Sequence, residues 1–354
     1  MSSIAITGMG IISPAGTNLF DFWTTLESGA ITYKVIEEFK NNNNFRIKIG
    51  SRLEDNSWQA MVPNQYKKNY GKASQYCIAA SISALNNAAI NISELQYLRV
   101  AVVLSTTMGE IQVEEEVSLI EHKKGKEKVP QNLLSKYSTD NIISALSDYL
   151  NISGPSYMIP AACAGGNFAV SLGKRLLEWD KADIVIAGGV DVFSRVAFTG
   201  FQRILSLTPD FCKPFDRFRK GLVLGEGCGI VILEKSDSAK ARKAKIYGEI
   251  IGAGLSSDRY HMTSPHPDGD GAARAMKYAL REAKLLPCDI NYISAHGTGT
   301  VANDKIEVKA LKEVFGPEKI PPISSIKSMI CLLYTSLAVR RWAKGSTNKH
   351  CYRR

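Results

Sequence analysis

The fold of this chain is decided by residues 155–187, which read PSYMIPAACAGGNFAVSLGKRLLEWDKADIVIA. The pattern predicts a strand over 155–161, a sharp small-residue turn around Cys163, a helix over 167–179 and a second strand over 183–187. Strands that alternate with helices in this way are typical of one sheet with largely parallel pairing. The stretch therefore indicates an α/β protein with Cys163 at the junction of a strand and a helix.

The same alternation continues on both sides of this stretch. Further strands are predicted over 4–7, 99–105, 227–233, 246–251 and 292–295, and further helices over 19–27, 73–89, 272–283 and 305–314. The run at 99–105 is continuous and β-branched, as in strands buried on both faces. The chain is therefore predicted to form a layered α/β fold with largely parallel strand pairing.

Two segments interrupt the alternation. Residues 8–16 are rich in glycine and predict a turn directly after the first strand. Their pattern Gly8-x-Gly10-x-x-Ser13 is a poor dinucleotide-binding fingerprint, because the third glycine is missing and no acidic residue closes a second strand about 20 residues on. Residues 34–68 are polar and irregular, and predict a surface insertion.

Composition excludes several classes of protein. The chain has 354 residues, 45% hydrophobic and 22% charged, so it is long enough to bury a large core. It has no apolar run of membrane-spanning length and no basic stretch at its start, which argues against a membrane span or a secretory signal. Its seven cysteines form no CxxC pair, so a disulfide framework or a metal site is not expected and the cytoplasm is the expected compartment.

The positive charge is concentrated near the end of the chain. The net charge is +10, and six basic residues but no acidic one follow residue 330, which leaves +4 for the preceding part. Basic residues do not alternate with stacking aromatic residues anywhere. Nucleic-acid binding is therefore not expected.

Cys163 is the first candidate for chemistry. The small residues around it permit a sharp turn, and the start of a helix favours the thiolate, which is the nucleophilic form. The alternative is a structural cysteine, because unpaired cysteine is among the most buried residue types.

His296 and Lys327 are the next candidates. His296 ends a predicted strand in AHGTGT, and a histidine before such a turn suits a hydrogen-bond donor that faces a cleft. Lys327 follows another apolar strand and could supply a fixed positive charge. The alternatives are a histidine that caps the next helix and a lysine that faces solvent.

Six segments, taken in order, resemble the motifs of one enzyme family. They are IAITGMGIISPAG at 4–16, AACAG at 161–165, KPFDRFRKGLVLGEG at 213–227, SSDRYHMTSPHP at 256–267, AHGTGT at 295–300 with NDKIE at 303–307, and SIKSM at 325–329. The ordered set resembles the β-ketoacyl-[acyl carrier protein] synthases, specifically the elongating type II branch of the thiolase superfamily.

The resemblance implies a thiolase-like, layered α/β/α/β/α fold with pseudo-duplicated halves. The first half, 1–245, would carry the nucleophile, and 246–330 would form an incomplete second half. A faint sequence echo between 4–12 and 247–255 fits this duplication. Residues 331–354 are expected to be an unrelated, non-native tail.

The resemblance also implies the chemistry. Cys163 would hold an acyl chain as a thioester, and His296 would assist the decarboxylation of a malonyl thioester. Lys327 would set the electrostatics of the site, paired with Glu307. Supporting residues by position are Thr298, Thr300 and Phe201. No metal or cofactor is implied.

The implied partners are an acyl carrier protein, acyl and malonyl thioesters, and a second copy of the chain in a homodimer. Carrier proteins are acidic, so a basic docking face is expected. By position, Lys67, Lys68 and Arg203 resemble the docking residues of the family. A solvated surface is the alternative reading of these three residues.

The sequence departs from the family after residue 330. The family motif continues to a second catalytic histidine, and Leu332 stands in its place. The chain as written is therefore expected to be inactive in condensation. A non-catalytic partner of the chain-length-factor type is the alternative function, although such subunits typically lack the nucleophile. Thiolases and initiating synthases fit less well, since thiolases use a second cysteine near the C-terminus and Lys327 has no place in a Cys-His-Asn set.

Overall fold

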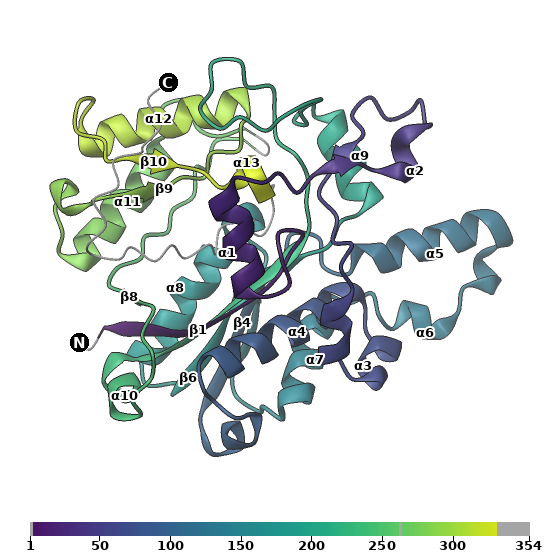
Figure 1. Cartoon of the computed structure of the whole chain (residues 1–354), viewed down its shortest axis with the longest axis horizontal. Coiled ribbons are helices and arrows are strands. Elements are labelled where there is room, and N and C mark those ends of the chain that lie inside the picture. The colour runs from purple at the N-terminus through teal and green to yellow at the C-terminus, as the bar shows by residue number, and fades with distance from the viewer. Residues whose placement is uncertain (1–2, 262–263, 331–354) are drawn as a thin grey trace.

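The computed structural model describes residues 3–261 and 264–330. The strands are β1 Ile4–Ile12, β2 Lys34–Val35, β3 Ile49–Gly50, β4 Val100–Ser105, β5 Ser156–Ile159, β6 Ile184–Asp191, β7 Gly227–Lys235, β8 Gly248–Ile250, β9 Ile293–Ser294 and β10 Ile323–Ser324. The α-helices are α1 Leu19–Ser28, α2 Glu37–Lys40, α3 Asn64–Asn69, α4 Lys72–Asn87, α5 Ile111–Lys124, α6 Gln131–Leu134, α7 Asp140–Leu150, α8 Gly165–Glu178, α9 Arg195–Arg203, α10 Ser236–Ala241, α11 Asp270–Ala283, α12 Val301–Phe315 and α13 Lys327–Ile330. Figure 1 shows their arrangement.

The central sheet has six strands in the order β5-β4-β6-β7-β1-β8. The pairs β5–β4 and β4–β6 are parallel, whereas β6–β7, β7–β1 and β1–β8 are antiparallel. The prediction of largely parallel pairing is therefore wrong for strands β7, β1 and β8. The physical reason is the connection 192–226, which leaves and re-enters the sheet at one end, so that Asp191 pairs with Gly227 and β7 runs back along β6.

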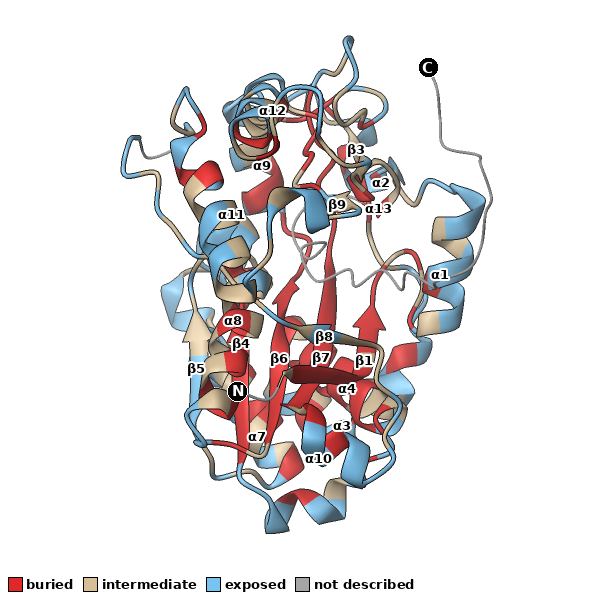
Figure 2. Ribbon diagram, turned by 90° about the vertical axis from the view of Figure 1, so that its left-hand side faces the viewer, coloured by how far each residue is buried: buried red, intermediate tan, exposed pale blue. Residues whose placement is uncertain are grey.

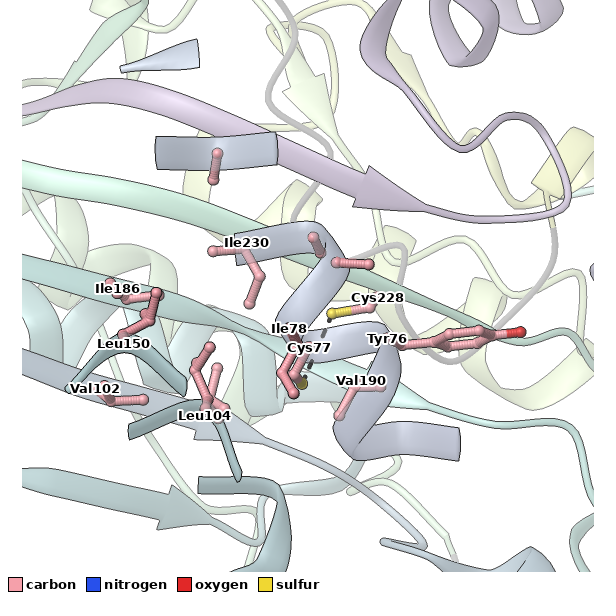
Figure 3. Close-up of a cluster of buried hydrophobic side chains, with 14 of the residues drawn as sticks. Tyr76, Cys77, Ile78, Val102, Leu104, Leu150, Ile186, Val190, Cys228 and Ile230 are labelled. Atoms are coloured by element: carbon pink, nitrogen blue, oxygen red, sulfur yellow. Dashed lines mark hydrogen bonds between the residues drawn. The ribbon is translucent and has the colours of Figure 1, made fainter. Parts of the chain in front are cut away.

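Helices cover both faces of this sheet. Val102 and Leu104 of β4 pack in the core cluster under α4 and α7, and Val103 packs in a second cluster under α8. This alternation follows from the two-residue period of a strand, and both faces are apolar because both are covered. Figure 2 shows β1, β4, β6 and β7 as a continuous buried layer. Figure 3 shows the α4 side of the core, where Cys77 of α4 and Cys228 of β7 lie with their sulfur atoms 3.8 Å apart.

The first glycine-rich segment extends the strand and does not form the predicted turn. Strand β1 continues through Gly8 and Gly10 to Ile12. A Cβ atom on Gly8 would lie 2.3 Å from the carbonyl oxygen of Ala84, and one on Gly10 would lie 1.9 Å from that of Ala80. These glycines are needed because the backbone of α4 rests directly on the strand. The turn itself begins only at Ser13.

The second half repeats this contact. A Cβ atom on Gly252 would lie 2.5 Å from the carbonyl oxygen of Ala279, and one on Gly254 would lie 1.9 Å from that of Ala275, both on α11. The sequence echo between 4–12 and 247–255 thus corresponds to a repeated close approach of a glycine to a helix, although Gly252 and Gly254 lie after strand β8 and not in a strand. The described part of 246–330 contains β8, α11, α12, α13 and the parallel pair β9–β10 (Figure 1).

Residues 34–68 are not a purely superficial insertion, contrary to the prediction. Phe39, Phe45 and Trp58 are buried, and the rings of Phe39 and Phe45 are stacked with centroids 4.1 Å apart. Many of the polar residues between them are exposed, but Ser51 is fully buried. Apolar residues at irregular spacing show no period, so their burial could not be predicted from the pattern.

Two findings concern membranes and metals. In the part of the chain that the structure describes, no helix is long and apolar enough to cross a bilayer. The same residues contain no cluster of three or more His, Cys, Asp or Glu side chains that could hold a metal ion.

Candidate active site

Cys163 lies in a tight connection between strand β5 and helix α8. A 3₁₀ turn over Ala162–Ala164 links the two elements, and Ala162 has a positive φ of 44°, which sharpens the turn. Helix α8 begins at Gly165, where a Cβ atom would lie 1.7 Å from Ser105 Oγ of β4. The helix start can therefore approach the sheet closely, and its positive end lies beside the thiol.

The Cys163 side chain is half-buried against an apolar cluster that includes Phe193 and Phe198. Phe201 of α9 packs against the same cluster. One side of the sulfur therefore faces apolar side chains, which is the environment that an acyl chain requires.

His296 and Lys327 follow two neighbouring parallel strands. His296 comes two residues after β9, and Lys327 comes three residues after β10. Ile293 pairs with Ile323 in this two-stranded sheet. Because the carboxyl ends of parallel strands meet at one edge, the loop that holds His296 lies beside the loop that leads to Lys327 at the start of α13. Ser325 Oγ joins these loops by donating to the carbonyl oxygen of Gly297 at 2.8 Å.

Glu307 of α12 holds the backbone of the histidine loop. Its carboxylate accepts hydrogen bonds from the backbone N–H groups of His296 at 2.7 Å and of Gly297 at 2.8 Å. Burial raises the pKa of Glu307, and these two hydrogen bonds counteract that rise. Glu307 thus supports the loop through its backbone, in addition to an electrostatic attraction to Lys327.

Electrostatics connect the two halves of the site. The Lys327 side chain is only 4% exposed. Burial raises the pKa of the Cys163 thiol, and the Lys327 charge counteracts this rise. Burial and then the same charge lower the pKa of His296 to about 3, so its imidazole is neutral at physiological pH. The Lys327 charge therefore acts on both Cys163 and His296, the other two residues that the sequence singled out.

Asp304 is a buried carboxylate that the sequence analysis did not single out. It accepts hydrogen bonds from the backbone N–H groups of Phe215 at 2.7 Å and Gly299 at 3.2 Å, and Arg219 Nε lies 3.6 Å from it. It joins the segment after Lys213 to the histidine loop. Its position in the quoted NDKIE motif was the available signal.

Thr298 and Thr300 have a local structural role. Their hydroxyl groups lie 2.9 Å apart, and the Thr300 side chain caps α12 by accepting from the backbone N–H of Asn303. Cys212 Sγ donates to the carbonyl oxygen of Thr298 at 3.4 Å. These contacts shape the turn after His296.

The three predicted docking residues do not form one patch within the chain. Lys67 and Lys68 lie in the last turn of α3, and Arg203 ends α9. Figures 1 and 2 both show α3 and α9 well apart. Their role in docking stays a prediction.

An α/β fold with a cysteine at a strand–helix junction, and with a histidine and a lysine after two paired strands, defines a condensing enzyme of the thiolase fold. The chain belongs to the β-ketoacyl synthase family: residues 1–239 match "Beta-ketoacyl synthase, N-terminal domain" and residues 247–341 match "Beta-ketoacyl synthase, C-terminal domain". This is an acyltransferase-class enzyme family. The second match continues past residue 330, but residues 331–354 lie outside the described part of the chain, so the expected unrelated tail stays a prediction.

Curated relatives and solved structures agree with this family. The chain is 33% identical over 335 residues to "3-oxoacyl-[acyl-carrier-protein] synthase 2" of Vibrio harveyi, and 34% identical over 334 residues to the protein of that name from Synechocystis. Each alignment covers 92% of this chain and 80% of the relative. Among solved structures, the chain resembles "The ishigamide ketosynthase/chain length factor" with a TM-score of 0.88 at 32% identity, covering 95% of this chain and 83% of that one. A β-ketoacyl synthase from Burkholderia phymatum matches with a TM-score of 0.86 at 28% identity and the same coverage.

Proposed function

We propose that this protein is a 3-oxoacyl-[acyl carrier protein] synthase that extends an acyl chain by two carbons. The observation that carries this proposal is the position of Lys327, whose charge acts on the thiol of Cys163 and on the imidazole of His296. The same positive charge thus favours the thiolate of the nucleophile and the neutral form of the hydrogen-bond donor.

The first half-reaction is acyl transfer to Cys163. The thiolate attacks the carbonyl carbon of an acyl thioester, the carbonyl becomes an oxyanion, and the carrier thiolate leaves and takes up a proton. The backbone N–H of Cys163 at the helix start supports the oxyanion. The positive end of α8 and the Lys327 charge both favour the thiolate, and so offset the effect of burial.

The second half-reaction forms the carbon–carbon bond. A malonyl thioester loses carbon dioxide, and the electron pair of the broken bond forms an enolate. A neutral His296 can donate its N–H to the thioester oxygen, which stabilises the developing charge. The enolate carbon attacks the acyl carbonyl on Cys163, the thiolate leaves, and a 3-oxoacyl thioester remains on the carrier.

One sequence feature is expected to affect the second half-reaction and not the first. Leu332 stands where the family motif has a second histidine, and it lies outside the described residues. We therefore expect acyl transfer to proceed and condensation to be slow in the chain as written.

The proposed partners are an acyl carrier protein and a second copy of this chain. A related solved structure, 26% identical, is titled as a type II PKS acyl-carrier protein in complex with its ketosynthase. Strand β5 supports pairing with a second copy, because it is the outer strand of the sheet and its residues Ser156 and Tyr157 are exposed. Unpaired edges of this kind readily add a further strand. A cytoplasmic location stays a prediction from the scattered cysteines.

The test is mass spectrometry of the intact protein after incubation with an acyl carrier protein thioester. The wild type and C288A, which lacks the exposed thiol of Cys288, should gain one acyl group, whereas C163A should gain none. Malonyl-dependent extension should then be measured for this chain and for a chimera with a family C-terminus in place of 331–354. Equal extension by both would contradict the expected effect of Leu332. Absence of acylation in the wild type would favour the chain-length-factor alternative.

A further inference from the structure

A buried carboxylate at the end of β6, Asp191, holds the turn between β4 and α5. It accepts hydrogen bonds from the backbone N–H groups of Thr107 at 2.8 Å and Met108 at 3.2 Å. It also accepts from the hydroxyl groups of Thr106 and Thr107, each at 3.1 Å. The Asp191 side chain is almost fully buried and forms no ion pair with a described residue. Four neutral donors from three consecutive residues thus converge on one carboxylate.

This turn lies beside the candidate nucleophile. Met108 packs against the core cluster under α4 and also against the phenylalanine-rich cluster that contains Phe193 and Phe198. The Cys163 side chain packs against that same phenylalanine-rich cluster. The turn directly follows Ser105, whose Oγ would lie 1.7 Å from a Cβ atom on Gly165, two residues after Cys163. The Asp191 charge also contributes, after burial, to the raised pKa of the Cys163 thiol.

We propose that Asp191 is a positioning residue for acyl transfer to Cys163, because its carboxylate holds the 106–108 turn in place as a wall beside the acylated sulfur. The inference rests on the proposed function and extends it to a residue outside the quoted motifs. Burying a carboxylate without an opposite charge is costly, and here the cost is offset only by hydrogen bonds from neutral donors. The turn that these hydrogen bonds hold contacts the phenylalanine-rich cluster beside Cys163. Asparagine at this position would remove the charge and replace one acceptor oxygen by a donor.

The neighbouring titratable groups are few. Asp191 also acts on Cys77 of α4. Glu110, at the start of α5, accepts from the backbone N–H groups of Ala73 and Ser74, and Glu226 accepts from that of Phe193 and contacts Lys72. Burial raises the pKa of Asp191 to about 6, so the carboxylate is charged at and above neutral pH. Asp191 therefore carries its charge throughout a titration of Cys163 above pH 7 in the wild type.

The experiment compares D191N with T107V, a near-isosteric variant that removes one hydroxyl donor and keeps the charge. Two quantities are measured: the pH midpoint of Cys163 alkylation by iodoacetamide, and the kcat and KM of acylation with short- and long-chain acyl thioesters. We expect D191N to lower the midpoint by about half a pH unit or more, because a nearby negative charge has been removed. We expect it to raise the acyl KM about tenfold with a smaller change in kcat, and T107V to raise KM by a smaller factor without moving the midpoint.

The outcomes separate the inference from the proposed function. Failure of the wild type to become acylated would overturn the proposed function and the inference with it. Normal acylation of the wild type with an unchanged acyl KM in both folded variants would overturn the inference alone. A midpoint shift of the same size in T107V would also overturn it, because the shift would then follow from disturbance of the turn. If D191N does not fold, as judged by circular dichroism, the KM of T107V decides.

Discussion

Gly10 and Gly254, which are 244 residues apart in the sequence, occupy equivalent positions in the two halves of the protein. A Cβ atom on either would lie 1.9 Å from a helix carbonyl oxygen, that of Ala80 or that of Ala275. The same close approach of a helix to a glycine is thus built twice from the same pair of residue types, once in β1 and once in the segment after β8.

The first prediction follows from this relationship. G10A and G254A should each lower the free energy of unfolding by about 3 kcal/mol, because the methyl group overlaps backbone atoms that cannot move aside. Urea denaturation measures the effect. Gly200 is the matched control, since a Cβ atom there would meet no atom within 4 Å, and G200A should be as stable as the wild type or more so. Wild-type stability of G10A would show that α4 does not rest on β1 as described.

The second prediction concerns Lys327. Substitution by methionine keeps much of the side-chain volume and removes the charge, so K327M should raise the pKa values of both Cys163 and His296. The pH midpoint of Cys163 alkylation should therefore move to higher pH, opposite to the shift expected for D191N. K312M, on α12 and part of no described ion pair, is the control and should leave the midpoint unchanged. If K327M moved the midpoint downward or not at all, the proposed electrostatic connection between the halves would be wrong.

The third prediction uses the lowered pKa of His296. The folded-state pKa of about 3 lies below the usual 6.5, so the unfolded chain binds a proton more readily between these values. The contribution of neutral His296 to stability is present above about pH 6.5 and is lost as the pH falls toward 3. Relative to H296Q, the wild type should therefore lose stability when unfolding is measured at pH 4.5 instead of 7.5. A constant difference between the two proteins over this range would contradict the lowered pKa.

The fourth prediction concerns Asp304, whose carboxylate joins the segment at Phe215 to the histidine loop at Gly299. D304N should lower the free energy of unfolding by about 2 kcal/mol, because a buried carboxylate loses charge-assisted hydrogen bonds and its contact with Arg219. E313Q is the control, since the Glu313–Lys277 ion pair is exposed on both sides and contributes little. If D304N and E313Q lost the same amount of stability in thermal denaturation, the proposed role of Asp304 would be wrong.

Much of the local structure could be predicted from the sequence. The alternation around Cys163 predicted β5, α8 and β6, with boundaries that differ from the observed ones by a few residues, because apolar spacing and small-residue turns are local signals. The ordered motifs indicated the family, which the comparisons confirm. They also singled out Cys163, His296 and Lys327, whose catalytic roles remain predictions.

Long-range contacts decided the rest. The antiparallel direction of β7, the strand conformation of Gly8 and Gly10, and the burial of Phe39 and Phe45 depend on elements distant in the sequence. Asp191 has no local motif, and its four hydrogen bonds exist only because β4 and β6 are neighbours in the sheet. The sequence by itself determined which residues could carry the chemistry. Only the tertiary structure decided which of them share one electrostatic environment, because burial and the distance between charges are properties of the folded chain.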